Sequence, residues 1–444
     1  MSTDHRRAAS LLQQVLQGHS AAELSPQLAP FNDAVTLRVP GGARATNEAI
    51  EQRWELLATS AAERDALCDA QTVAHADCYA NNIENFIGTV KVPVGIAGPL
   101  RVNGLFANGD YLVPLATTEA ALVASYNRGA QLVSEAGGCA AMLLNESVSR
   151  VPGFAFCNLQ EVGAFVAWVV PHVDSLRSVA EATTRHGKLL DMRVTVEGNH
   201  VYLHFEYSTG DAAGQNMVTI ATQAICDYIQ VHSPVMPRAC YVEANMSGDK
   251  KASLQSFVSV RGKKVTAEVY LSPHLIEKYL HTTPHDMENY WRMAAIGGVL
   301  SGTMGIQGHY ANGLAALYIA CGQDAACVAE CAVGVTRFEV TSDGNLYAAV
   351  TLPNLLVGTV GGGTNLPGQR ACLEIMGLAG EGKARAFAEV CAALVLAGEL
   401  SIIAALASGE FTRAHQRLAR TRRTSATAAS ISATATSMRA TDID

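Results

Sequence analysis

The sequence has no excess of basic residues, no paired cysteine motif and no long uninterrupted apolar run. Its 32 lysines and arginines are outnumbered by 40 aspartates and glutamates, which gives a net charge of -8. This balance argues against nucleic acid as the main partner, because binding a phosphate backbone requires a basic surface. Anionic small molecules stay open as ligands, since a local cluster of arginine and lysine can outweigh the overall charge.

The 11 cysteines follow no disulfide or zinc-binding spacing. The tightest group, Cys321, Cys327 and Cys331, has no nearby histidine and no CxxC pair, so we expect buried, reduced thiols and no metal site. An odd number of cysteines and no secretory leader predict a reducing compartment. We expect the cytoplasm; a weak similarity of the N-terminus to a mitochondrial presequence leaves the matrix as the alternative.

No segment is predicted to span a membrane. Glycines and polar residues interrupt the apolar stretch 293–323, and Glu399 interrupts the stretch 391–408, so both are predicted to be buried helices. The chain has 444 residues, of which 49% are hydrophobic and 16% charged. It is therefore long and apolar enough for two or three domains around a sizeable core.

Composition divides the chain into parts. Residues 1–85 are polar and helix-like, and residues 152–240 have the pattern of a separate α/β unit. That unit has a strand at GFAFC, a predicted helix over 161–184, and two strands that form a hairpin around Gly198. The second of these strands leads through TGDAAGQNM into a helix, an arrangement that commonly holds a phosphate. Residues 424–444 are mostly serine, threonine and alanine and are predicted to be disordered.

Two motifs carry isolated charges. In VEANMSGDKK (242–251), Lys250 follows Asp249 in a predicted loop, and an ammonium beside a carboxylate stays charged and can stabilise an oxyanion. In ACGQDAAC (320–327), Asp324 is a lone carboxylate that needs a cationic partner if it is buried. Taken separately, the first could be a solvated charged turn and the second a structural ion pair.

Three further motifs have features of a ligand site. In ATTEAALVAS, Thr117 or Thr118 is the predicted helix N-cap, which places Glu119 in the first turn. GTVGGGTNLPGQ (358–369) has three consecutive glycines, which favour contact with a ligand, before a helix near Pro367. His415 lies among several arginines and could protonate a leaving thiolate, or simply end a helix whose dipole the arginines match.

In their order along the chain, these motifs closely resemble the catalytic portion of hydroxymethylglutaryl-CoA (HMG-CoA) reductase. The strings that carry the resemblance are ENFIGTVKVPVGIAGPL, PLATTEAALVASYNRG, GDAAGQNM, DKK, YIACGQDAA, GTVGGGTNLPGQ and LAGELSIIAAL. They extend from about residue 85 to residue 420. The form they resemble is the class I, NADPH-using type without its membrane anchor.

The resemblance implies four catalytic residues. Lys250 would stabilise the oxyanion as hydride reaches the thioester carbonyl, and His415 would protonate the departing CoA thiolate. Glu119 would donate a proton to the aldehyde oxygen in the second reduction. Asp324 would hold Lys250 and Glu119 in one network.

The resemblance also implies binding residues. Those for substrate are Arg150, Asn245, Asp249, Lys251, Arg292 and Asn312. Those for the cofactor are Thr184, Arg185, Asp211, Ala213, Gly214, Gln215, Asn216, Met217, Gly361 and Gly362. Arg185 is the reason to expect NADPH rather than NADH, because a guanidinium can bind the 2′-phosphate in a bidentate way; alternatively it is an ordinary surface arginine.

Three positions depart from the family pattern. Glu243 stands where a serine is expected, Arg292 where a lysine is expected, and Ala252 follows DKK where a proline is usual. The substitutions put substrate affinity and loop shape in doubt more than the type of reaction.

The resemblance implies an α+β fold. A large substrate domain (86–151 and 241–423) surrounds a long central helix, a small ferredoxin-like NADP(H)-binding domain (152–240) is inserted in it, and a helical N-terminal domain precedes it. It implies an enzyme that reduces HMG-CoA to mevalonate and CoA with two NADPH. A homodimer or homotetramer with active sites at the subunit interface is expected. The alternatives are an NADH-preferring reductase that degrades mevalonate and a catalytically silent acyl-CoA-binding homologue.

Overall fold

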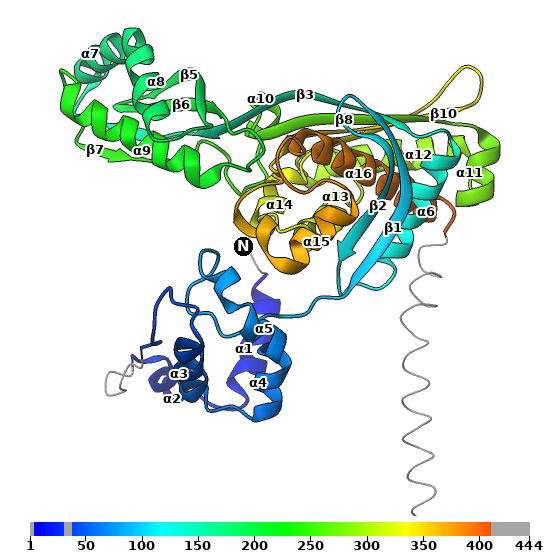
Figure 1. The fold of residues 1–444 in the computed structure, drawn as a ribbon, viewed down its shortest axis with the longest axis horizontal. Coiled ribbons are helices and arrows are strands. Elements are labelled where there is room, and N and C mark those ends of the chain that lie inside the picture. The colour runs from blue at the N-terminus through cyan, green and yellow to red at the C-terminus, as the bar shows by residue number, and fades with distance from the viewer. Residues whose placement is uncertain (1–3, 31–37, 410–444) are drawn as a thin grey trace, which may run out of the picture. The chain divides into compact units, whose positions relative to one another are not determined.

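The computed structural model describes residues 4–30 and 38–409. The chain forms two compact units, Met1–Gly88 and a second that begins at Thr89 (Figure 1). His415 and the tail 424–444, for which disorder was predicted, lie outside the described residues.

The N-terminal unit is helical, as its composition predicts. Its helices are α1 (His5–Leu16), α2 (Ala21–Leu24), η1 (Ser25–Leu28), α3 (Asn47–Leu57), α4 (Ala61–Leu67), α5 (Ala70–Ala74) and η2 (Ala76–Tyr79). A small core gathers around Ile50, Trp54 and Phe86. Arg53 is buried inside it and donates hydrogen bonds to the backbone carbonyls of Pro40 and Phe86, so its charge is well solvated by the protein.

The second unit is built on one ten-stranded, almost wholly antiparallel sheet, which confirms the α+β class. Its strands are β1 (Val94–Gly104), β2 (Asn108–Ala116), β3 (Cys139–Arg150), β4 (Gly153–Ala155), β5 (Lys188–Glu197), β6 (His200–Ser208), β7 (Ala239–Tyr241), β8 (Gly262–Leu271), β9 (Val335–Val340) and β10 (Leu346–Leu355). The long strand β3 joins two parts of the sheet. Residues 139–147 pair with β1 or β8, and residues 148–150 pair with β6.

Residues 153–241 form a ferredoxin-like module. Its elements run β4, helices α7 (Leu159–Val169), η3 (Val170–His172) and α8 (Val173–Ala182), β5, β6, α9 (Gln215–His232) and β7, and the strand order is β7-β4-β6-β5. The predicted hairpin is confirmed, with Val201, Leu203 and Phe205 buried. The single helix predicted over 161–184 is wrong. The chain breaks into two helices at Pro171, which has no N–H to donate.

The helix α16 (Ala384–Ala407) is the core of the large part (Figure 1). By length and composition it could cross a membrane, but most of it is buried, against α6 (Leu122–Glu135) and the strands β3, β8 and β10. Such a helix, apolar on all sides, is typical of a protein interior. Gly129 of α6 lets the two helices approach closely, because a Cβ there would lie 1.9 Å from the Ala397 carbonyl oxygen.

The remaining helices cover the same face of the sheet or join its strands. They are α10 (Gln255–Val258), α11 (Pro273–Leu280), α12 (Pro284–Ser301), α13 (Tyr310–Ala320), η4 (Ala325–Cys327), α14 (Val328–Cys331), η5 (Gly362–Asn365) and α15 (Pro367–Ile375). The helix start predicted near Pro367 and the burial of Cys321, Cys327 and Cys331 are confirmed.

The stretch 293–323 was predicted to be buried. This is wrong for its first residues, which form the exposed second half of α12. Met293, Ile296, Val299 and Leu300 are 64 to 82% exposed. Contiguous exposed apolar side chains of this kind mark contact surfaces.

The predicted N-cap of α6 is also wrong. The helix begins at Leu122, and its N-cap is Ala121 in a left-handed conformation with φ of 71°. The Thr117 hydroxyl accepts a hydrogen bond from the Glu119 N–H, and the Thr117 N–H binds the Pro93 carbonyl. Thr117 therefore closes a turn before the helix, and Glu119 projects from that turn.

Candidate active site

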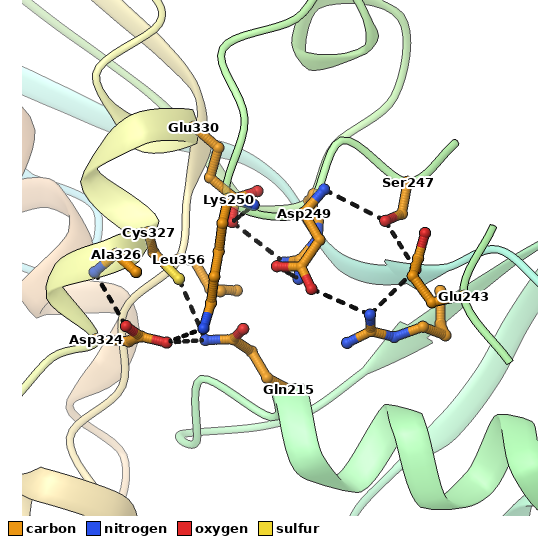
Figure 2. A network of polar contacts seen from close by, with 12 residues as sticks. Gln215, Glu243, Ser247, Asp249, Lys250, Asp324, Ala326, Cys327, Glu330 and Leu356 are labelled. Atoms are coloured by element: carbon orange, nitrogen blue, oxygen red, sulfur yellow. Dashed lines mark hydrogen bonds and ion pairs between the residues drawn. The ribbon is translucent and has the colours of Figure 1, made fainter. Parts of the chain in front are cut away.

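Lys250 and Asp324 form an ion pair at the centre of the site (Figure 2). The Lys250 Nζ lies 2.9 Å from Asp324 Oδ2, and the same oxygen accepts a hydrogen bond of 3.2 Å from Gln215 Nε2. The other oxygen, Oδ1, accepts from the Ala326 N–H at 3.0 Å. The pair joins three segments that are far apart in the sequence, and both side chains stay partly exposed, at 43% and 38%.

The pairing stabilises the charged forms of both groups. The hydrogen bond with Asp324 raises the pKa of the Lys250 ammonium, although partial burial opposes it. Burial acts to raise the pKa of the Asp324 carboxyl, but the hydrogen bonds from Lys250 and from the Ala326 N–H together lower it below its usual value. The pair is therefore ionised across the neutral range, and it is lost only as the pH falls through the lowered pKa of Asp324 or rises through that of Lys250.

Three glycine-containing loops pack together around this pair. Gly322, two residues before Asp324, touches Gly363 so closely that a Cβ would lie 2.2 Å from its carbonyl oxygen. Gly358 packs in the same way on Ala213, where a Cβ would lie 2.5 Å from the Ala213 nitrogen. The motifs GDAAGQ, GQD and GTVGGG thus meet at one place, which the sequence alone could not show.

Glu119 belongs to a second group. Asn312 Nδ2, on α13, donates to both of its carboxylate oxygens, at 3.2 and 3.0 Å. Glu119 and Asn312 line a cavity of about 440 Å³ that is also bordered by Val328, on the helix that follows Asp324. They also line an adjacent cavity of about 500 Å³. The expected contact between Asp324 and Glu119 is replaced in this structure by the contact with Asn312.

The residues predicted to bind substrate meet partly in a buried ion network. Arg150 Nη1 donates to Glu243 Oε2 at 3.0 Å and to Asp249 Oδ2 at 3.1 Å. Glu243 also accepts from the Asn245 N–H and from the Ser247 hydroxyl. The unexpected carboxylate at position 243 is therefore neutralised by Arg150.

The residues predicted to bind the cofactor lie on adjoining elements. Thr184 and Met217 touch, with the Thr184 hydroxyl 3.0 Å from the Met217 sulfur. Arg185 is exposed in the turn between α8 and β5. Asp211 binds the backbone N–H groups of Gly382 and Ala384, so its carboxylate caps the start of α16.

Two predicted residues stand apart from this group. Arg292 pairs with Glu288 on its own helix α12, and His415 lies outside the described residues. Conversely, the motif analysis missed Glu330 and Arg261. Both are fully buried, and Glu330 binds the backbone N–H of Lys250. A signal for Glu330 was present, because it is the next charge after Asp324 in an apolar run.

We predict that Asp324→Asn lowers the pKa of Lys250 toward that of a free lysine, because the hydrogen bond and charge that raise it are weakened. The pKa can be followed by nuclear magnetic resonance titration of the lysine side chains after ¹³C reductive methylation. Asp110→Asn, which removes the surface pair with Arg101, is the matched control and should leave Lys250 unchanged. An unaltered Lys250 pKa in Asp324→Asn would contradict the assignment.

Comparison with known proteins agrees with this site. Residues 49–420 match the family model of hydroxymethylglutaryl-coenzyme A reductase. The chain is 44% identical to the 3-hydroxy-3-methylglutaryl-coenzyme A reductase of Pyrococcus horikoshii, over 78% of this chain and 85% of that protein. It is 42% identical to the reductase of the same name from Methanocaldococcus jannaschii, over 76% and 85%.

A solved structure shares the fold. It is the class II 3-hydroxy-3-methylglutaryl-CoA reductase from Streptococcus pneumoniae bound to NADPH, with a TM-score of 0.61 and 19% identity over 80% of this chain and 96% of that one. The family match covers most of the chain and includes the loops that carry Lys250 and Asp324. The chain belongs to the hydroxymethylglutaryl-coenzyme A reductase family.

Proposed function

We propose that this protein reduces HMG-CoA to mevalonate and CoA in two hydride-transfer steps, with NADPH as the reductant. The observation that carries the proposal is the Lys250–Asp324 ion pair, which is contacted by Gln215, the first residue of α9 after the glycine-containing loop 210–214. It places a fixed positive charge, suited to a developing oxyanion, beside a loop suited to a dinucleotide. Membership of the HMG-CoA reductase family indicates which reaction this arrangement would catalyse.

The loop 210–217 and the glycines near 361 fit a nicotinamide dinucleotide. Gly214 is the N-cap of the 18-residue helix α9, whose free N–H groups and dipole suit a phosphate. A Cβ at Gly361 or Gly362 would meet no atom within 4 Å, so space is open beside these residues. NADPH, when bound, would supply the hydride for each step.

In the first reduction, Lys250 would stabilise the oxyanion that forms on the thioester carbonyl. A preorganised, partly desolvated ammonium does this well because its charge needs no rearrangement during the reaction. We assign to His415 the protonation of the CoA thiolate that leaves. The support for this role is that Ala405 and Leu406, at the end of α16, line the same cavity as Glu119.

In the second reduction, Glu119 would donate a proton to the aldehyde oxygen. Asn312 holds both oxygens of its carboxyl group and so fixes its direction at the cavity wall. We propose that the ion network of Arg150 and Asp249, with Asn245 and Lys251, binds the acyl end of the substrate. Lys251 Nζ donates to the Asp249 carbonyl at 2.9 Å and is otherwise exposed.

The exposed apolar face of α12 supports a homodimer as the active form. A self-complementary contact would cover Met293, Ile296, Val299 and Leu300 and carry Arg292, on the same helix, into the interface. We also propose the division into a substrate domain (86–151 and 241–423) and an inserted cofactor domain (152–240), for which the separate ferredoxin-like strand order is the support.

We propose the class I type and a cytoplasmic location. Identity to the class II structure is 19%, against 34% to the reductase 1 of Dictyostelium discoideum and 41 to 44% to the archaeal relatives. Those archaeal relatives give no support to the mitochondrial alternative.

The test of the function is cofactor oxidation at 340 nm with HMG-CoA as substrate. We expect two NADPH to be consumed for each CoA released, because a thioester must be reduced to an alcohol. Lys250→Met should lower kcat by about 100-fold or more, the usual effect of removing an oxyanion donor. Binding of HMG-CoA without any turnover would favour the silent homologue instead.

Arg185→Ala tests the choice of cofactor. We expect KM for NADPH to rise about tenfold or more while KM for NADH stays nearly constant, because only the 2′-phosphate loses a partner. Arg177→Ala, at a partly exposed arginine on α8, is the matched control. Equal use of NADH and NADPH by the unmodified protein would refute the role of Arg185, and a preference for NADH would favour the NADH-preferring alternative.

A further inference from the structure

The backbone of Lys250 has an unusual conformation and is hydrogen-bonded to a buried carboxylate. Its φ is 57°, in the left-handed region that residues with a Cβ rarely adopt. The Lys250 N–H donates a hydrogen bond of 3.1 Å to Glu330 Oε1, on α14. The side chain of the same residue reaches the opposite way, to Asp324 (Figure 2). Two carboxylates of the short segment 324–330 therefore fix Lys250: Glu330 binds its backbone N–H, and Asp324 binds its side-chain ammonium.

Glu330 is itself fixed by buried charge. Its side chain is 0% exposed, and Oε1 lies 3.6 Å from Nη1 of Arg261, which is also 0% exposed. Arg261 Nη2 donates to Asp249 Oδ1 at 2.6 Å, and Asp249 in turn binds Arg150. This network therefore reaches both residues that flank the peptide bond between Asp249 and Lys250.

We propose that Glu330 is a positioning residue for Lys250, holding the left-handed backbone from which the ammonium reaches Asp324 and the reacting carbonyl. The proposal rests on the function proposed above for Lys250 and adds a residue that touches neither substrate nor cofactor. Without an acceptor at Glu330, the strained backbone is free to relax. The ammonium would then lose the fixed position on which stabilisation of the oxyanion depends.

The same carboxyl couples the position of Lys250 to pH. Burial raises the pKa of Glu330 to about 7, against the opposing effect of Arg261. The other titratable groups that face it are Asp249, Cys327 and Cys331, and both cysteines are neutral at this pH because burial raises their pKa values. As the pH falls through about 7, Glu330 takes up a proton and its hydrogen bond to the Lys250 N–H loses its charge assistance.

Three variants separate positioning from bulk stability. Glu330→Ala removes the acceptor and should lower kcat by about 10- to 100-fold with little change in KM. Glu330→Gln keeps an acceptor oxygen of the same shape but not its charge, so it should recover part of that loss and match the unmodified protein below pH 7. Glu389→Gln is the matched control, because Glu389 is also 0% exposed and accepts backbone N–H groups, from Phe106 and Ala107, at another place in the unit.

The decisive readout is the pH profile of mevaldehyde reduction, in which no thiolate leaves and His415 is not required. The unmodified protein and Glu389→Gln should lose activity as the pH falls through about 7. Glu330→Gln should lack this low-pH limb of the profile. The proposal is overturned if Glu330→Gln keeps the limb, or if Glu330→Ala matches the unmodified protein. Failure of the unmodified protein to reduce HMG-CoA would instead count against the proposed function.

Discussion

Buried carboxylates that bind backbone N–H groups hold the loops of the large unit in place. Glu399, on α16, accepts from the N–H groups of Gly308 and His309 at the start of α13, the helix that carries Asn312. Glu330 accepts from the N–H of Lys250. Burying a carboxylate is costly, and hydrogen bonds from backbone N–H groups offset part of that cost, so each such contact restricts the loop it binds. The exposed polar groups of the site thus owe their positions to charges inside the core.

Much of this architecture could be predicted from the sequence, and the failures have local causes. Alternation in 200–208 predicted the hairpin, and the apolar stretch 391–408, interrupted by Glu399, predicted the buried helix that is observed as α16. Pro171 was overlooked inside an otherwise helical pattern. The start of α6 was misplaced because Thr117 uses its hydroxyl to close a turn instead of capping the helix. Propensity alone does not distinguish those two uses of a threonine.

The site residues were predicted from motifs, and the expected contact of Asp324 with Lys250 is present, but the other contacts of the site were not predicted. Gln215 and Asp324 are more than a hundred positions apart in the chain, and only the packing of the glycine loops brings them together. The interior network of Arg261 and Glu330 lies outside every recognised motif, because a buried ion pair leaves no periodic signal in sequence. The structure also forms two groups, one at Lys250 and one at Glu119, and the cavity beside Glu119 is bordered by Val328, on the helix that follows Asp324.

The central claim is that Lys250 acts through its ion pair with Asp324. A double-mutant cycle in kcat/KM for HMG-CoA tests it most directly, with Lys250→Met, Asp324→Asn and the double variant. If the two residues act as one unit, the double variant should be no slower than Lys250→Met alone, although each single change costs about 100-fold or more. Losses that multiply in the double variant would show that Asp324 acts independently of Lys250 and would contradict the account.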